Sequence, residues 1–237
     1  LAQHTGARLA WIPRRAGDRG ALDTGCLPNL LPGGRPVQHA RAREQVERVW
    51  GTAGLPSTPG LRMAEMLSRR MGALLIGGVD PADLPDSQAA LAAVQSAGFV
   101  VSLELRESAI TALADVVFPI APVVEKSGSF LNWEGRIRPF EPTLSTSYGS
   151  DHRVLHSLAA AMGVQLGTPD ADSVRAEIER LGGWNGPRVF DLDHRPTPPA
   201  QLGPDEAILA GWRLLLDDGR LQDGERFLAG TARPSVV

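Results

Sequence analysis

The sequence predicts an α/β protein that contains a parallel, Rossmann-like sheet with flanking helices, an inserted β-hairpin and a helical C-terminal part. Three observations support this prediction. Strand-like and helix-like segments alternate over residues 73–121, glycines bound a charged stretch at 125–142, and helical periodicity returns after residue 150. Strands that alternate with helices are typical of right-handed crossovers between parallel strands.

The N-terminal third carries weaker signals than the middle of the chain. Residues 8–12 alternate enough to predict a short strand. The glycine- and proline-rich stretch 13–36 predicts an ordered loop, and residues 40–50 predict a short charged helix. A further helix is expected to begin at Pro59, because proline suits the first helical position, and to end at Gly72.

The middle of the chain predicts three strands and two helices. The strands are expected at 73–78, 99–105 and 115–121, and the helices at 87–97 and 108–114. The first strand is a continuous apolar run, which is typical of a parallel strand covered on both faces. Sheets of this kind bind ligands beyond the carboxyl ends of their strands.

Three loops lie at those carboxyl ends, at 77–86, 104–108 and 121–128. No G-x-G-x-x-G sequence opens a helix after a strand, so the dinucleotide fingerprint is absent. The glycine turn at 76–81 could bring backbone N–H groups close to a phosphate. Turns of this type end most α/β strands, however, and a plain turn is favoured.

Residues 125–142 predict a β-hairpin, because two short strand-like segments flank a Glu-Gly turn. Gly128 and Gly135 suit corners where the backbone needs a positive φ. The stretch holds Lys126, the only lysine among 24 basic residues. One interpretation is a hairpin stabilised by a compensated charge set. The members of this set are Glu125, Lys126, Glu134 and Arg136.

The other interpretation of this hairpin is a contact with an anionic cofactor through Lys126, Asn132 and Arg136. Residue chemistry alone modestly favours the structural interpretation, because the charges compensate one another.

The C-terminal third predicts amphipathic helices at 150–163 and 169–183, and the second has acids early and arginines late, which suits the helix dipole. A proline-rich connector follows at 184–204, then a last helix at 205–219 and a strand-like end at 226–237. The predicted division of the chain is a preceding α/β tail and ordered loop at 1–45, an α/β domain with the hairpin at 46–165, and a helical and proline-rich part at 166–237.

Composition excludes several classes of function. The formal net charge of -3 gives no electrostatic reason to expect a nucleic acid or an acidic lipid. No apolar run approaches the roughly 20 residues of a membrane span. Cys26 is the only cysteine, so this segment cannot hold an iron–sulphur cluster by cysteines alone. It is expected to be a small buried apolar side chain, and no nucleophile is favoured.

A metal site is considered at Asp151, His152 and His156, because His at i and i+4 shares a helix face. No third ligand stands at a diagnostic spacing, so no metal is expected.

The stretch "ADVVFPIAPVVEKSGSFLNWEGR" at 114–136 resembles the molybdopterin oxidoreductase family. Members carry an "ADVVLP" strand followed by "EKxGTFxNxEGR" or a near variant, and here Ser129 replaces the threonine. Upstream, "LLIGGVDP" corresponds to the family's strand and "GxNP" turn, with Asp80 where asparagine is usual. Within the family, "EGR", "WIPRRAGDRGA" and "LLLDDGRLQDG" are similar to the large peripheral-arm subunit of NADH:quinone oxidoreductase (respiratory complex I), of an actinobacterial type.

The resemblance implies a fragment, the later part of a molybdopterin-enzyme-like domain. In complex I this domain is a scaffold without metal or pterin, and the iron–sulphur clusters belong to an N-terminal region that is not in this chain. The implied function is support of electron transfer from NADH to quinone without a catalytic site. The implied partners are the other peripheral-arm subunits, with no nucleic acid and no direct membrane insertion. The implied location is the cytoplasmic side of the cell membrane.

The alternative is a cofactor-binding fragment of a true molybdopterin enzyme, similar to formate dehydrogenase or nitrate reductase. The resemblance then implies that the loops at the strand ends and the hairpin hold a pterin dinucleotide. The residues implied are Gly77, Gly78, Asp80, Ser108, Lys126, Asn132 and Arg136. An unrelated Rossmann-like nucleotide binder is disfavoured by the absent glycine fingerprint.

Overall fold

The computed structural model divides the chain into two compact units, Leu1–Arg188 and Val189–Val237. It describes residues 2–8, 10–13, 17–84, 86–145 and 147–188, and then 202, 203, 205–207 and 227. Nearly all of the predicted connector beyond residue 188, the helix at 205–219 and the C-terminal strand lie outside the described residues. The division at residues 45 and 165 stays a prediction.

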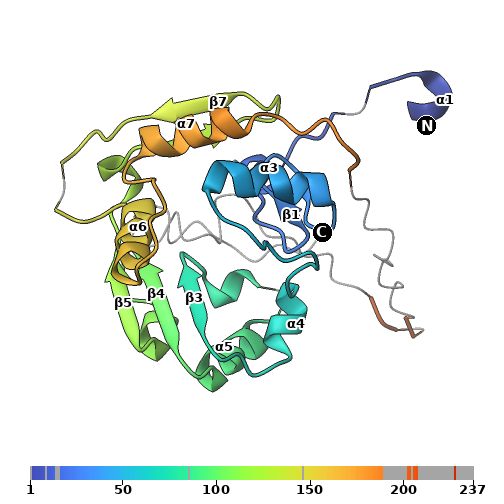
Figure 1. Cartoon of the computed structure of the whole chain (residues 1–237). Coiled ribbons are helices and arrows are strands. Elements are labelled where there is room, and N and C mark those ends of the chain that lie inside the picture. The colour runs from blue at the N-terminus through green and yellow to red at the C-terminus, as the bar shows by residue number, and fades with distance from the viewer. Residues whose placement is uncertain are drawn as a thin grey trace. The chain divides into compact units, whose positions relative to one another are not determined.

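A three-stranded parallel sheet forms the centre of the α/β part (Figure 1). Its strands are β3 (Leu74–Gly77), β4 (Val100–Glu104) and β5 (Val116–Pro119), in the order β3-β4-β5. Helix α5 (Ser87–Ser96) connects β3 to β4, and the Asp86 carboxylate caps its first turn. The predicted α/β class is therefore confirmed. The predicted helix at 108–114 is wrong, because this stretch holds only the 3₁₀ turn η2 (Thr111–Leu113).

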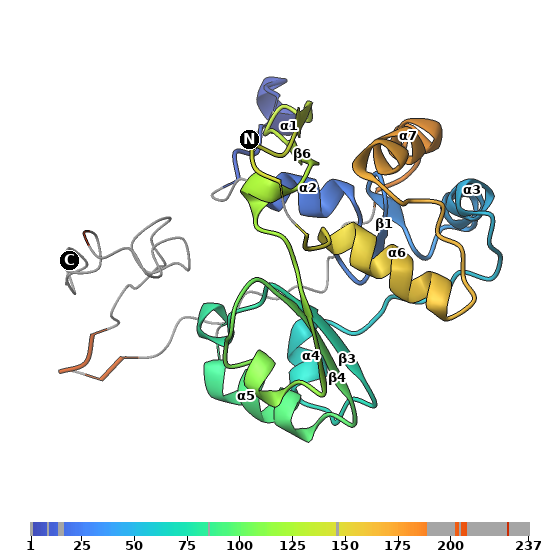
Figure 2. The same ribbon diagram turned by 90° about the vertical axis from the view of Figure 1, so that its left-hand side faces the viewer.

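The hydrophobic core lies on one face of this sheet. Val94 of α5 packs against Val100 and Ile110, and Leu74 and Ile76 of β3 join them. On the opposite face, Leu75 is 56% exposed. The prediction that β3 is covered on both faces is therefore wrong among the described residues, because β3 is an edge strand and α5 covers only the Leu74 side. Figure 2 shows α5 on one side of the sheet.

The N-terminal segment differs from its prediction. Residues 8 and 10–12 belong to no strand, so the predicted strand there is wrong at its described positions. An alternating pattern forms a strand only with a hydrogen-bonded neighbour, and none pairs with these residues. Helix α1 (Ala2–Thr5) precedes them. The predicted loop 13–36 contains helix α2 (Asp18–Asp23) and a short antiparallel pair, β1 (Leu30–Leu31) with β2 (Arg35–Pro36).

Helix α3 (Ala40–Trp50) confirms the predicted charged helix and packs against α7 (Ala171–Leu181). Its inner side buries Ala42 and Val46 completely. Helix α4 (Met63–Leu67) is shorter than the predicted 59–72, and it packs against α5. It begins after Arg62, whose amide donates to the Glu65 carboxylate at 2.7 Å, so Pro59 is not its first residue.

The region between α3 and α7 is organised by a buried arginine. Arg35 is 1% exposed, and its Nε donates to the side-chain oxygen of Gln45 at 3.0 Å. Its terminal nitrogens donate to the carbonyl of Pro32 and to the carbonyls of Leu181 and Gly182 at the end of α7. One side chain therefore joins β2, α3 and the last turn of α7.

The hairpin is present as β6 (Gly128–Leu131) and β7 (Ile137–Phe140), paired antiparallel. The short turn η3 (Val123–Glu125) precedes it. Gly135 has φ 84°, as predicted. Gly128 is not among the positive-φ glycines, so that prediction is wrong. Gly128 instead makes room for an aromatic ring, because a Cβ there would lie 2.7 Å from the ring of Phe140.

Helix α6 (Asp151–Ala161) and helix α7 confirm the two predicted amphipathic helices. The Asp170 carboxylate caps α7 through the amide of Ser173. An isolated parallel bridge between Ile120 and Gly149 connects the end of β5 to the segment before α6. Helix α6 therefore starts beside the carboxyl end of the sheet.

Candidate functional site at the carboxyl ends of the strands

The end of β3 carries the glycine turn and Asp80. Gly78 has φ 59°, and its amide donates to the carbonyl of Leu103 in β4 at 3.2 Å. The Asp80 carboxylate accepts from the amide of Ala82 at 3.0 Å and caps the 3₁₀ turn η1 (Pro81–Asp83). These groups close the turn, so the Gly78 amide is already engaged within the sheet.

The end of β4 carries Ser108 in a closed turn. The Ser108 amide donates to Thr111 Oγ1 at 2.7 Å, and Ser108 Oγ accepts from the Thr111 amide at 3.2 Å. A groove of about 510 Å³ adjoins this turn and is lined also by Glu104 and Glu107. The buried Glu104 carboxylate accepts from the amide of Leu105 at 2.9 Å. Two carboxylates therefore face this groove.

Lys126 follows β5 and forms an ion pair outside the hairpin. Its Nζ donates to Asp151 in the first turn of α6, and the lysine side chain is mostly buried. The predicted charge set is therefore only partly correct. Glu134 and Arg136 pair within the hairpin at 3.1 Å, whereas Lys126 connects the hairpin to a helix 25 residues further along the chain.

Asn132 and Arg136 form the hairpin turn itself. Asn132 Oδ1 accepts from the Arg136 amide at 2.8 Å, and Asn132 Nδ2 donates to Glu134 at 3.3 Å. The side chains of Asn132 and Arg136, both predicted as ligand-binding residues, therefore have their partners within the same turn. The sequence predicted this turn. The hydrogen bonds that stabilise it join residues only two to four positions apart, within the same turn.

The seven predicted cofactor residues lie in separate turns, at the end of β3, after β4, after β5 and at the tip of the hairpin. The hydrogen bonds and ion pairs described above for them are local, apart from the bond between Gly78 and Leu103 and the pair between Lys126 and Asp151. Figures 1 and 2 both show the hairpin and the parallel sheet as separate regions. The cationic groups of Lys126 and Arg136 already face carboxylates, and Asp80, Glu104 and Glu107 add negative charge at the strand ends. Carboxylates at these strand ends repel a phosphate, whereas cationic or neutral donors attract one.

The described residues contain no group of three or more His, Cys, Asp or Glu side chains that could hold a metal ion. The His152 ring contacts Ser150 Oγ at 3.1 Å, and burial lowers the pKa of His152. Cys26 is exposed, so the prediction that it is buried is wrong. It follows the short helix α2 at the surface, where its Sγ lies 3.4 Å from Thr24 Oγ1.

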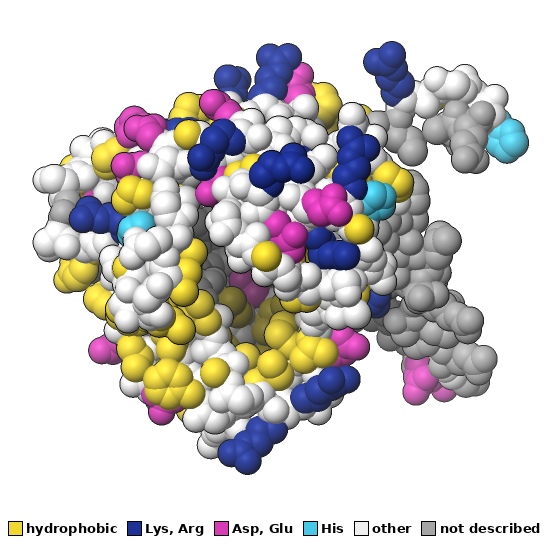
Figure 3. Space-filling model, in the orientation of Figure 1, with side chains coloured by type: hydrophobic (Ala, Val, Ile, Leu, Met, Phe, Trp, Pro, Cys, Tyr) yellow, Lys and Arg dark blue, Asp and Glu magenta, His cyan; other side chains and the backbone are white. Residues whose placement is uncertain are grey.

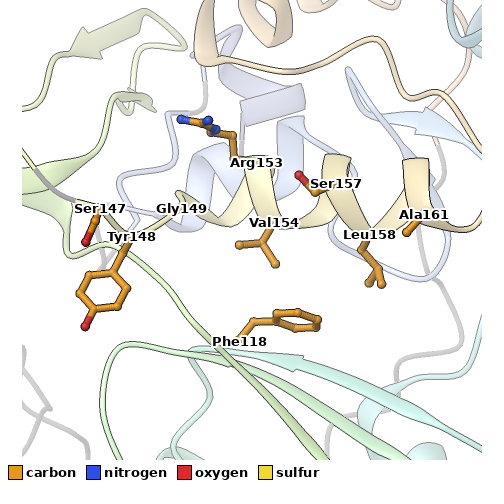
Figure 4. A pocket seen from close by; sticks show the side chains of 9 residues that line it. All are labelled: Phe118, Ser147, Tyr148, Gly149, Arg153, Val154, Ser157, Leu158 and Ala161. Atoms are coloured by element: carbon orange, nitrogen blue, oxygen red, sulfur yellow. The ribbon is translucent and has the colours of Figure 1, made fainter.

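Sequence patterns did not predict a groove of about 420 Å³ between β5 and α6. Figure 4 shows Val154 and Leu158 pointing toward the ring of Phe118, while Arg153 extends from the other side of the helix. The apolar stripe of α6 was the available signal, but the partner strand could not be inferred from it. In Figure 3 hydrophobic side chains gather on the part of this face where the sheet and α6 lie.

No helix within the described part of the chain is both long and apolar enough to cross a membrane.

A parallel sheet, a crossover helix and a hairpin that follows the third strand are the features that the sequence patterns predicted. The model of the molybdopterin oxidoreductase family matches residues 7–152, and the chain belongs to that family.

The relatives give a more particular likeness. The chain is 54% identical to the G subunit of NADH-quinone oxidoreductase of Mycobacterium tuberculosis over 100% of its length, and 52% identical to that of Streptomyces coelicolor over 96%. It spans 30% and 28% of those proteins. It is also 34% identical to the alpha subunit of F420-dependent formate dehydrogenase 2 of Methanococcus maripaludis, over 69% of this chain and 25% of that protein.

Proposed function

We propose that the chain is part of the large peripheral-arm subunit of a bacterial NADH-quinone oxidoreductase. In this proposal it supports electron transfer from NADH to quinone as a scaffold and has no catalytic residue of its own. The observation that carries the proposal is the 54% identity to the Mycobacterium tuberculosis relative along the whole chain. The ion pairs of Lys126 with Asp151 and of Arg136 with Glu134 support the scaffold role, because these positive charges are already compensated.

The proposal extends to the cofactors, partners and location of the complete protein. Iron–sulphur clusters would be held by other parts of the subunit, and none by this chain. The partners would be the other subunits of the peripheral arm, and the complex would lie on the cytoplasmic side of the cell membrane. The α/β domain at 46–165 would supply the scaffold, flanked by the parts at 1–45 and 166–237.

A purified complex tests this proposal. The full-length subunit that contains this sequence is tagged in its own cells, and the complex is isolated and analysed for protein composition, iron, molybdenum and pterin. We expect the peripheral-arm subunits to co-purify with iron. Molybdenum and pterin should each amount to less than about 0.1 mole per mole of the subunit, roughly tenfold below one bound cofactor per subunit. Stoichiometric molybdenum or pterin, or isolation of the subunit alone, contradicts the proposal.

The second candidate is a cofactor-binding part of a molybdopterin-dependent oxidoreductase. The 34% identity to a formate dehydrogenase subunit favours it, because that likeness extends over 69% of the chain. Replacement of both cations, Lys126→Ala with Arg136→Ala, discriminates between the candidates. A cofactor enzyme would lose bound pterin in this variant, whereas Arg69→Ala, at an exposed arginine outside the hairpin, would retain it.

A further inference from the structure

The hairpin exposes aromatic side chains on a rigid support. Phe130 and Trp133 are each 48% exposed. Single exposed apolar residues are common on protein surfaces and need no explanation. Here, however, the two aromatics belong to one hairpin, and exposed arginines stand beside them in the sequence. Tryptophan, arginine and aromatic residues are enriched where protein interfaces concentrate their binding energy.

Contacts at both ends hold the hairpin in place. At the turn, Asn132 Oδ1 accepts from the Arg136 amide, and the Arg19 guanidinium approaches the carbonyl of Trp133 at 3.5 Å. At the open end, Arg175 of α7 donates to the carbonyl of Gly128 at 3.2 Å. A surface that is already ordered loses less conformational entropy on binding than a flexible loop.

The strand register assigns side chains to the two faces of the hairpin. Phe130 is paired with Arg138 and Gly128 with Phe140, so these residues share one face. Leu131 lies on the other face, which is turned toward α2, since a Cβ on Gly20 would lie 3.7 Å from the Leu131 side chain. We define the ribbon face as Phe130, Arg138 and Phe140. The two rings stack with their centroids 5.3 Å apart.

The charge on the ribbon face is not compensated by the described residues. Arg138 is exposed and has no hydrogen-bond or ion-pair partner among them. Arg136, directly before β7, pairs with Glu134 and leaves most of its side chain exposed. In Figure 3 lysine and arginine side chains, with acidic side chains between them, lie on the upper part of the molecule, where β7 and α7 lie in Figure 1.

We propose that the ribbon face, with Trp133 beside it, is the contact surface for an acidic protein partner. The partner offers an apolar hollow for Phe130 and a carboxylate for Arg138. The proposal rests on the proposed function, in which the chain belongs to a multi-subunit complex, and it specifies which surface one neighbouring subunit contacts.

Three other occupants fit less well. The pair Asn132–Arg136 is hydrogen-bonded, so by alternation the backbone groups of Pro139 point away from β6. A β-strand added to this edge of β7 would meet a proline, which has no N–H to donate. A second copy would bring two copies of the same positively charged face together across a two-fold axis. A lipid surface is recognised by larger clusters of about 4–8 basic residues.

Cross-linking in the assembled complex tests the proposal. A benzophenone side chain is placed at position 130 of the full-length subunit, and the isolated complex is irradiated and analysed by mass spectrometry. We expect a cross-link to a different subunit at a site bordered by aspartate or glutamate. Arg138→Glu should lower the cross-link yield about tenfold because it places like charges opposite each other, while Arg138→Lys retains most of it. Arg69→Glu, at an exposed arginine outside the hairpin, controls for a general charge effect.

The remaining outcomes contradict the proposal in different ways. A cross-link within the same polypeptide shows that the subunit covers its own ribbon face. A cross-link to a second copy or to lipid replaces the partner with one of the disfavoured occupants. Absence of any cross-link, in a complex whose subunits co-purify normally, shows an open surface and leaves the proposed function intact. Isolation of the subunit without the complex removes the proposed function and this inference together.

Discussion

The parallel sheet and the region between α3 and α7 bury different kinds of side chain. Under the sheet, Val94, Val100 and Ile110 pack in a cluster of apolar groups. Between the helices, Arg35 is as deeply buried as Ile110 and makes hydrogen bonds instead. Apolar packing is distributed over many contacts, and volume-conserving changes are tolerated. In the second region, by contrast, the hydrogen bonds of a single side chain, Arg35, connect β2, α3 and α7.

The buried Arg35 guanidinium has no carboxylate among its hydrogen-bond acceptors, and helix α7 explains why its charge is tolerated. The carbonyls of Leu181 and Gly182 stand at the C-terminal end of α7, where the helix dipole is negative. Burial lowers the pKa of Arg35, but a guanidinium remains charged in proteins at neutral pH. The Trp184 ring lies 5.8 Å from the guanidinium carbon and adds a cation–π contact. The helix end thus takes the place of a counter-ion.

We predict the largest effect from Arg35→Met. The change removes the hydrogen bonds to Gln45 and to the backbone carbonyls, and it leaves those part-buried carbonyls without this donor. The free energy of unfolding should fall by about 3 kcal/mol or more. Urea denaturation followed by circular dichroism measures it. Arg138→Met, the same change at an exposed site, should alter it by less than about 0.5 kcal/mol. Equal effects in the two variants would show that the burial and hydrogen bonds of Arg35 do not stabilise the fold more than an exposed arginine does.

The second prediction compares two glycines, one in each region. A Cβ at Gly33 would lie 2.3 Å from a terminal nitrogen of Arg35, and φ there is 77°. A Cβ at Gly98, which precedes β4, would lie 2.6 Å from the carbonyl oxygen of Gly72. Gly33→Ala and Gly98→Ala should each lower the free energy of unfolding by about 2 kcal/mol, from strain or overpacking.

A double-mutant cycle separates the two causes. In the Arg35→Met background, Gly33→Ala should lower the free energy of unfolding by clearly less than in the parent, because the guanidinium with which the added Cβ would clash is absent. Gly98→Ala should lower the free energy of unfolding equally in both backgrounds, since its added Cβ would clash with the backbone carbonyl of Gly72 in the sheet region. Additive effects for both glycines would show that Gly33 is constrained by its φ alone and not by contact with Arg35.

These regions also differ in how far sequence predicts them. The strands β3, β4 and β5 each coincide with a short apolar run, so periodicity over a few residues sufficed. Arg35 stands in a glycine- and proline-rich stretch that is typical of a surface loop, and its partners at Leu181 and Gly182 are about 146 residues away. No local pattern encodes that contact.

The candidate site shows the same limit. The glycine turn after β3 and the hairpin turn at Gly135 were predictable, because turn chemistry is local. The pairing of Lys126 with Asp151 was not, because it depends on where α6 begins in space. Gly128 was predicted for its backbone freedom, whereas the structure requires it for the space that the Phe140 ring occupies.

The third prediction concerns a buried polar group under the sheet. Ser102 is 1% exposed, and its hydroxyl has no hydrogen-bond partner among the described residues. Ser102→Ala removes this unsatisfied group and leaves a methyl side chain of nearly the same shape. The free energy of unfolding should rise by about 1 kcal/mol, opposite in sign to the effect at Arg35. Urea denaturation measures it, with Ser96→Ala as the control, because the Ser96 hydroxyl donates to the carbonyl of Ala93. A loss of stability in Ser102→Ala would show that the hydroxyl has a partner in solution.

The smallest effect is expected at the start of α7, where Asp170 caps the helix. Its Oδ1 accepts from the amide of Ser173 at 2.8 Å and from the Ser173 hydroxyl at 2.7 Å, and these bonds lower the pKa of the Asp170 carboxyl below its ordinary value of 3.8. Because folding favours the ionised form, the stabilisation is complete above the unfolded-state pKa. It is lost as the pH falls through the lower folded-state pKa.

Asp170→Asn keeps a capping oxygen and removes the titration. The free energy of unfolding should therefore change little at neutral pH, and its decline below pH ~4 should become less steep than in the parent chain. Denaturation at a series of acidic pH values measures the slope, with Glu179→Gln on the same helix as the control for a lost negative charge. A plot of stability against pH that superimposes on that of the parent below pH ~4 would show that the cap contributes equally in both protonation states.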